Sequence, residues 1–440
     1  MKKILFAHIA FLMTLNLHAG DIQTDMVYNL RKPADITPYA WEIEELPEEP
    51  EEKTPFRMKN RTFEFGFTGG ANMANDFTTG KDILQETWVI DINKLSNGFK
   101  LGFGLNITPF FFNVNIRDQW GFGLDVARIE GFGNTDISGK LLNLKQADEE
   151  KFGAGAAIFA DIGIPVFFHV KKLKVKVRPG IFVPLAYTEP DFSYTFKEYT
   201  DENGKKGTFI GLDYNMRIYT SVFLEFENLS SIDIGQTLNS FNMDAIGFDL
   251  SAEVEYPLFS WLDLGANIKN IPITPSKPDY SIELKDRVYA DTGKIDFGEL
   301  INGGDFPDDV VYTPENFTPV YGPGRKFIHR PFKMVFFANY HPFKTRILSL
   351  IPSLGFAVNS LYVSPGSIEG GLKIRFDFAN IFVPTIGVNY EDRVWKNSVD
   401  FILNLRAFGI GIGVSSQSQD FVKSWQLGGL SANVAVQFGW

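Results

Sequence analysis

The sequence predicts an all-β protein, a transmembrane antiparallel up-and-down β-barrel of about 14 strands (12–16) with long extracellular loops. Three observations predict this class. Segments in which apolar residues alternate with polar or small ones recur from residue 61 onward. The 43 Phe and 40 Gly suit strands with bulky side chains toward lipid and small ones toward a lumen. The final segment, LSANVAVQFGW, alternates strictly and finishes on Trp440.

The N-terminal residues predict export. Lys2 and Lys3 precede an apolar stretch, and small Ala19 offers a cleavage position, so we expect a signal peptide over residues 1–20. No later apolar run approaches the ~18 residues that a spanning helix needs, so we expect only strands to cross the membrane. The chain contains 0 Cys, which excludes disulfides, thiol catalysis and Cys-ligated metals.

Residues 21–60 form an acidic segment rich in Pro and Glu. Seven Glu lie between Glu42 and Glu52. We interpret the segment as a solvated periplasmic leader that is dispensable for insertion, with a plug or partner-binding segment as the alternative. The net charge of −11 becomes −13 when Lys2 and Lys3 leave, because residues 1–20 hold no acid. This acidity argues against a nucleic-acid partner.

The barrel is expected over residues 61–440. The clearest alternation predicts two-faced strands at 62–68, 100–108, 120–126, 172–178, 248–256, 372–378 and 430–440. Further strands are expected near 110–117, 153–164, 214–227, 261–269, 331–340, 353–360, 382–390, 399–406 and 408–415.

The connections fall into two classes. Residues 256–261 and 340–344 are short, aromatic and contain Pro, which predicts turns at a periplasmic rim. Surface loops are expected at 131–150, 187–207, 228–241, 271–327 and 391–398, with a projecting hairpin over 280–297. Residues 71–97 lack clean alternation and predict either a short segment that enters the lumen or an ordinary external loop.

The last strand also predicts an assembly signal. Phe438 and Trp440 stand on its apolar face, a pattern typical of strands that the barrel-assembly machinery recognises in outer-membrane proteins. We therefore expect outer-membrane lipid and that machinery as partners, in a Gram-negative-type (diderm) bacterium. Loss of Trp440 is expected to block assembly.

Charged residues on the predicted inner faces are candidates for lining the lumen. They are the basic Lys172, Lys174, Lys176, Arg178, Arg217, Lys373 and Arg375 and the acidic Glu225, Glu253 and Glu255. In an open pore, such rows would select solutes by charge, and the Lys172–Arg178 row would favour anions. In a closed barrel they would form a salt-bridged filling, and the same row could instead lie near the periplasmic headgroups.

No pattern for catalysis or cofactor binding occurs. His169, His329 and His341 lie beside predicted strand ends without metal-binding spacing, and nucleophile elbows, P-loops and dinucleotide motifs are absent. We therefore predict no metal, no cofactor and no enzymatic activity. An outer-membrane lipase, whose Ser and His leave no local motif, and a secreted soluble β protein remain as weaker alternatives.

Taken together, residues 61–440 resemble the bacterial outer-membrane barrels related to the long-chain fatty-acid transporter. The shared features are the signal peptide, the segment before the barrel, the Gly- and Phe-rich strands and the terminal aromatic residue. The family's N-terminal Asn-Pro-Ala motif is absent, and Gly69-Gly70-Ala71-Asn72 does not match it, so no binding residue carries over. The resemblance implies passive uptake of a small solute or hydrophobic molecule. The alternative is a structural, adhesin-like barrel with a blocked lumen.

Overall fold

A computed structural model gives the fold of the chain. It describes residues 61–76, 79–80, 98–116, 119–138, 147–200, 202, 204, 206–222, 243–291, 311–312, 320–343, 346–358, 366–391 and 393–440. Among these residues, no helix is long and apolar enough to cross a membrane. The expected signal peptide, the acidic leader and most of residues 71–97 lie outside the described residues.

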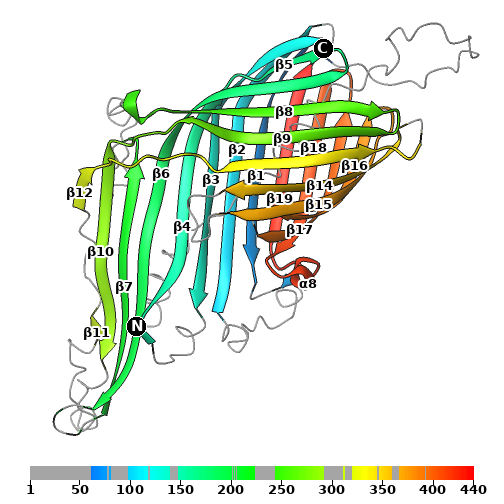
Figure 1. The fold of residues 1–440 in the computed structure, drawn as a ribbon. Helices are drawn as coiled ribbons and strands as arrows, with labels where there is room; N and C mark the ends of the chain where they lie inside the picture. Colours follow the sequence, from blue (N-terminus) through cyan, green and yellow to red (C-terminus); the bar gives the residue numbers. More distant parts are fainter. Residues whose placement is uncertain are drawn as a thin grey trace, which may run out of the picture.

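Fourteen antiparallel strands close into a ring, which confirms the predicted antiparallel β-barrel of about 14 strands but not its long loops (Figure 1). β1 pairs with β2 on one side and with β19 on the other, so the ring has no free edge. The ring strands are β1 (Phe63–Asn75), β2 (Gly98–Ile116), β3 (Trp120–Ser138), β4 (Ala147–Gly163), β6 (Leu173–Thr200), β8 (Gly247–Phe259), β9 (Leu262–Thr274), β13 (Phe332–Tyr340), β14 (Leu348–Val358), β15 (Ser367–Phe376), β16 (Phe382–Glu391), β17 (Val394–Asn404), β18 (Phe408–Ser418) and β19 (Leu430–Gly439).

Five further strands are attached to the ring: β5 (Val166–Val170), β7 (Lys206–Thr220), β10 (Tyr280–Asp291), β11 (Val311–Tyr312) and β12 (Val320–Pro323). β5 continues the path of β4 beyond Pro165 and pairs with β3 and β6. β6 changes partner along its length, because its first half pairs with β8 and its second half with β7. The second half of β6, with β7 and β10, therefore extends beyond the ring as a projecting sheet (Figure 1).

Several expected loops are strands instead. Residues 187–200 belong to β6, and residues 280–291 form one strand that pairs with β7 rather than a hairpin. Of residues 391–398, Glu391 ends β16 and β17 begins at Val394, so only a tight turn separates the two strands. Residues 110–116 complete β2 and are not a separate strand. Residues 228–241 lie outside the described residues. The expectation of long loops was wrong at these sites because a strand can continue pairing beyond the apolar band.

The two faces of each ring strand differ as the alternation predicts. On β19, Leu430, Phe438 and Trp440 are exposed on the outer face, while Asn433 and Gln437 are buried on the inner face. Trp440 lies at the same end of the ring as the turns after β8 and β13, where Phe259 stacks on Trp261 at a centroid distance of 5.1 Å. We call this the Trp440 end.

A β-bulge in β3 changes which side chains face inward. Ala127 has φ of 50°, and the register against β4 shifts between Asp125 and Arg128. A bulge adds one residue to one strand, so the inward face moves from odd to even residues. Asp125 before the bulge and Arg128, Glu130 and Phe132 after it therefore all point into the ring.

Candidate functional site: an aromatic cluster above an arginine network in the lumen

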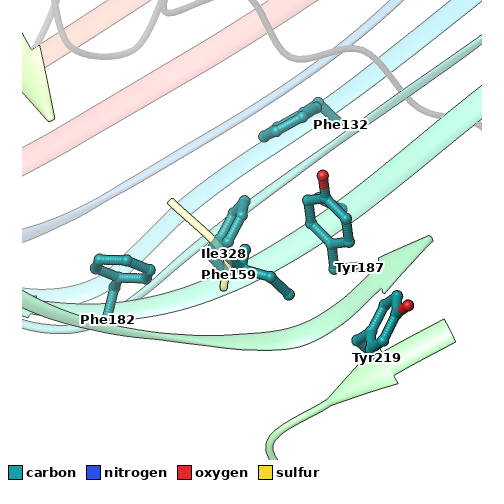
Figure 2. Close-up of a cluster of buried hydrophobic side chains, with 7 residues drawn as sticks. Phe132, Phe159, Phe182, Tyr187, Tyr219 and Ile328 are labelled. Atoms are coloured by element: carbon teal, nitrogen blue, oxygen red, sulfur yellow. The ribbon is translucent and has the colours of Figure 1, made fainter. Parts of the chain in front are cut away.

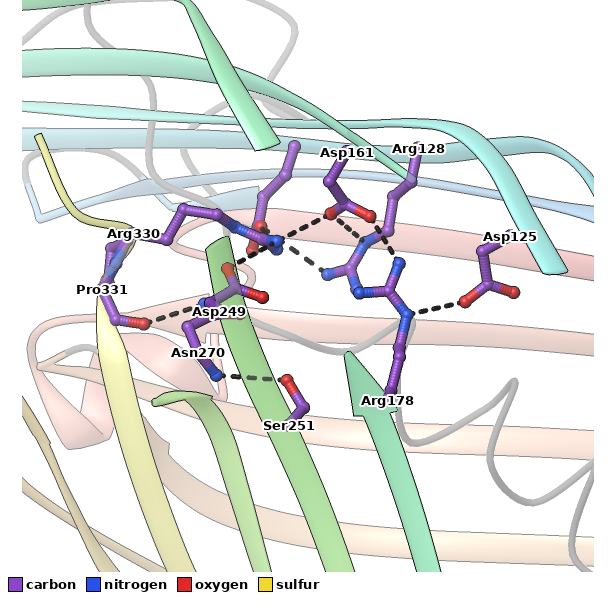
Figure 3. A network of polar contacts seen from close by, with 10 residues as sticks. Asp125, Arg128, Asp161, Arg178, Asp249, Ser251, Asn270, Arg330 and Pro331 are labelled. Atoms are coloured by element: carbon purple, nitrogen blue, oxygen red, sulfur yellow. Dashed lines mark hydrogen bonds and ion pairs between the residues drawn. The ribbon is translucent and has the colours of Figure 1, made fainter. Parts of the chain in front are cut away.

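A buried arginine crosses the interior of the ring. Arg330 precedes β13, and its side chain has 0% exposure. Its guanidinium lies 2.6 Å from Glu130 Oε2, 2.9 Å from Asp161 Oδ2 and 3.1 Å from Asp249 Oδ2 (Figure 3). These carboxylates belong to β3, β4 and β8. Between β13 and β3 the ring contains β4, β6, β8 and β9, so the contact with Glu130 spans the lumen rather than neighbouring strands.

Two more arginines complete this set. Arg178 of β6 donates from Nε to Asp125 at 2.8 Å and pairs with Asp161. Arg128 lies 3.6 Å from Glu130 and 3.8 Å from Asp161. We call the set the arginine network; it contains Arg128, Arg178, Arg330, Asp125, Glu130, Asp161 and Asp249. Buried charges persist only when paired, so the network is a salt-bridged filling of the lumen.

Local backbone features make room for the network. The bulge at Ala127 brings Asp125 and Arg128 to the same side of β3. Gly163 at the end of β4 lies beside the Arg178 guanidinium, and a Cβ on this glycine would overlap it. A side chain at residue 163 would therefore displace the arginine that joins β6 to β3 and β4.

An aromatic cluster lies next to the network, on the side away from the Trp440 end. It consists of Phe132, Ala157, Phe159, Phe182, Tyr187, Tyr219 and Ile328, all buried (Figure 2). The Phe159 and Phe182 rings meet edge to face with centroids 5.9 Å apart, and the Arg330 guanidinium lies 5.9 Å from the Phe182 centroid. Because the inner face of such a barrel is ordinarily polar, an aromatic surface there calls for a functional explanation.

The predicted basic row on β6 faces acids. Lys174 lies 3.4 Å from Glu255, and Lys176 stands opposite Glu253 in the register with β8. Arg178 joins the arginine network. Lys172 is exposed in the turn before β6 at the Trp440 end. Lys174 and Arg178 of the row therefore have acidic partners, whereas Lys172 is exposed.

The remaining predicted lumen residues are dispersed. Arg217 lies on β7, outside the ring, and pairs with Glu283 at 2.9 Å. Glu225 lies outside the described residues. Lys373 and Arg375 are on β15, where Arg375 lies 3.7 Å from Asp377. All of these residues were predicted to line the lumen. The structure places Lys373 and Arg375 on a ring strand but Arg217 on the projecting sheet.

Sequence patterns missed the residues that cross the lumen. Arg330 lies in a segment without alternation, and the parity change at Ala127 hid Arg128 and Glu130. A second missed set joins β13 to β15 and β16 to β17, with Lys333 at 3.0 Å from Glu369 and Lys396 at 3.4 Å from Glu391. Lys333 and Lys396 lie on strands whose apolar and polar residues alternate. A charged side chain on the polar face of such a strand was the signal that could have identified them.

A histidine at the Trp440 end is buried in a polar set. His341 Nε2 lies 3.1 Å from Asp263 Oδ2, and its Nδ1 lies 2.9 Å from Ser349 Oγ. A histidine placed between a serine and an aspartate by hydrogen bonds is the arrangement of catalytic triads in serine hydrolases. Here, however, Arg346 also donates to Asp263 at 3.2 Å, and Ser349 is only 6% exposed. Within the described part of the chain, no group of three or more His, Asp or Glu could hold a metal ion.

Comparisons with known proteins give a likeness of fold. No family model matches the chain, and no curated protein matches it. A mutant of the monoaromatic hydrocarbon channel TodX is 8% identical, with a TM-score of 0.45, covering 87% of this chain and 91% of that one. The Pseudomonas putida toluene transporter TodX is 9% identical, with a TM-score of 0.43 and coverages of 86% and 89%. A Pseudomonas aeruginosa FadL homologue is 8% identical, with a TM-score of 0.39 and coverages of 87% and 91%.

Proposed function

We propose that the protein is an outer-membrane channel that passes a small hydrophobic molecule through its lumen, and that the aromatic cluster is the surface this molecule contacts. The observation that carries the proposal is the set of four buried aromatic rings on the ring strands β3, β4 and β6, with Tyr219 of β7 packed beside Tyr187 at a centroid distance of 6.4 Å. Binding sites for apolar molecules are concave, largely aromatic and flanked by a few polar groups. The aromatic cluster beside Arg330 has this composition.

The outer face supports a position in the membrane. Leu354 is 65% exposed and Ile368 is 72% exposed on neighbouring strands of the ring. Exposed apolar rows of this kind are unfavourable in water and favourable in lipid. A closed ring satisfies its backbone groups internally, as lipid demands. We assign the Trp440 end to the periplasm and the projecting sheet to the cell exterior.

The filling of the lumen favours a hydrophobic cargo over ions. The arginine network and the Lys174–Glu255 pair neutralise charges that an anion-selective pore would leave facing water. A small apolar molecule can bind the aromatic cluster without displacing these ion pairs. Passage toward the Trp440 end then requires the network to move aside.

A surface-interaction protein is the second candidate. The projecting sheet carries exposed ion pairs between β7 and β10, including Arg217 with Glu283 and Arg287 with Asp213. This surface is available to a partner outside the cell whether or not the lumen conducts. An adhesin-like barrel would not increase uptake of small molecules.

Uptake of a radiolabelled monoaromatic solute by bacterial cells that express the protein tests the proposal. We expect Phe159→Leu and Phe182→Leu to lower the uptake rate while the barrel folds normally. Contact between one of these Phe rings and an aromatic solute contributes about 0.5–1.5 kcal/mol beyond the buried area. Its loss therefore lowers the affinity for the solute about 2- to 12-fold. The matched controls are Phe401→Leu and Phe356→Leu, since both rings lie on the outer face and are 45% and 42% exposed. Uptake equal to that of cells without the protein would support the adhesin-like barrel instead.

A further inference from the structure

An exposed apolar patch lies at the end of the ring opposite Trp440. The connection between β18 and β19 contains the short helix α8 (Phe421–Ser424), seen below the ring in Figure 1. Phe421 is 47% exposed, Val422 61% and Trp425 58%. Phe421 packs edge to face on Trp395 at the start of β17, with centroids 4.9 Å apart. The patch therefore includes residues near the β16–β17 turn and in the β18–β19 connection.

The polar side of α8 is turned toward the protein and holds the helix in place. Asp420 caps the helix by accepting from Lys423 N at 2.9 Å, and the Lys423 ammonium donates to the Asp76 carbonyl. Ser424 is fully buried and accepts from Asn397 Nδ2 at 2.9 Å. The one basic side chain of the helix therefore points inward, and the outward surface is apolar and aromatic.

A strained leucine extends the patch. Leu427 has φ of 59°, a left-handed conformation that usually falls to Gly after a helix, and its side chain is 43% exposed. A Cβ on Gly80 would lie 2.6 Å from Leu427 Cβ, so the leucine packs closely on this glycine. A leucine in this conformation is strained, and its half-exposed side chain adds apolar surface to the patch.

The patch is continuous with the outer face of the ring. Leu430 at the start of β19 is 57% exposed and stands opposite Met73 of β1, which is 49% exposed. Val414 on β18 is 52% exposed on the same face. On β19, the same face also carries Phe438, and Trp440 follows it at the other end of the ring. The apolar band therefore runs from the Trp440 end to α8 without a polar break on β19.

We propose that α8, with Trp395, Trp425 and Leu427, is an anchor that inserts into the outer leaflet of the membrane at the boundary between acyl chains and headgroups. The proposal rests on the membrane location given above. Lipid is the occupant because the large exposed side chains of the patch are uncharged and because Trp and Phe favour this boundary. The exposed Asp420 beside Phe421 is engaged as the cap of the helix. The anchor fixes the height of the ring at the end opposite Trp440.

Site-specific fluorescence quenching tests the anchor, and the natural absence of Cys permits a single label. Val422→Cys carries a bimane dye in phosphatidylcholine–phosphatidylglycerol vesicles that contain a phospholipid nitroxide near the carbonyl level. We expect strong quenching by this nitroxide and weak quenching by aqueous iodide. Val422 is exposed, so the variant should fold.

Two control sites separate the possible failures. Ile412→Cys lies on the outer face of β18, and Glu202→Cys lies at the tip of the projecting sheet. If bimane at 422 is quenched by iodide as strongly as at 202, while 412 remains quenched by lipid, the anchor is refuted and the membrane barrel stands. If 412 is also quenched only by iodide, the membrane location itself is refuted.

Discussion

Arg330 joins strands that the ring holds far apart. Its guanidinium is fully buried among Glu130, Asp161 and Asp249. We expect Arg330→Met to lower the free energy of unfolding by about 3–5 kcal/mol, because three carboxylates lose a buried counter-charge. The measurement is urea-induced unfolding of the barrel in detergent micelles. The folded fraction is detected by its distinct mobility on a gel when the samples are not heated.

An exposed arginine pair provides the control for this change. Arg287 pairs with Asp213 on the projecting sheet, with side-chain exposures of 54% and 32%. Arg287→Met should cost about 1 kcal/mol or less, as exposed ion pairs do. Equal effects of the two substitutions would show that the Arg330 contacts do not hold the interior together.

At the scale of elements, the bulge in β3 sets the inner face of the strand. Deleting Ala127 would restore a regular register against β4, shift the register against β2, and turn either Asp125 or the Arg128 and Glu130 pair toward lipid. An arginine on the lipid face costs about 2–4 kcal/mol near the middle of the membrane. We therefore expect the deletion to reduce the amount of folded barrel in the outer membrane strongly, measured by heat-modifiable gel mobility.

Substitution of Ala127 is the control that separates the effect of the changed register from the effect of losing the alanine side chain. Ala127→Gly keeps the chain length and relieves the positive φ of 50°. It should assemble at least as well as the natural chain. Normal assembly of the deletion variant would mean that β3 tolerates either register and that the bulge is not required.

Strand alternation predicted the ring well and the projecting sheet poorly. The strands at 248–256, 382–390 and 430–440 were found because lipid and lumen impose a two-residue period. β6 continues to Thr200 with a changed partner, and no local pattern indicates where a strand leaves one neighbour for another. For this reason residues 187–200 of the loop expected at 187–207, and residues 280–291 of the hairpin expected at 280–297, are single strands instead.

The candidate site was less predictable than the fold. Lys174 and Glu255 were found because they alternate with apolar residues on clear strands. Arg330 follows an irregular segment, and its partners Asp249 and Glu130 lie 81 and 200 residues away in the sequence. Contacts across a lumen depend on ring closure and bulges, which a single sequence does not encode as a local period.

At the scale of the whole molecule, the fold separates three environments. The outer face of the ring is apolar, the interior combines the arginine network with the aromatic cluster, and the projecting sheet extends from the end opposite Trp440 (Figure 1). In the orientation proposed above, a hydrophobic molecule that enters from the cell exterior would meet the cluster before the network. The network would then be the barrier between the cluster and the Trp440 end.

Spin-label scanning of β4 tests the central claim most directly, namely that this strand turns its aromatic face inward and its other face toward lipid. Single cysteines at residues 157, 158, 159, 160 and 162 are labelled in the reconstituted protein, and collision rates with oxygen and with a water-soluble nickel complex are measured. We expect a two-residue period, with high oxygen collision at Ile158, Ala160 and Ile162 and low collision with both reagents at Ala157 and Phe159. High nickel collision at 158, 160 and 162, or an inverted period, would contradict it.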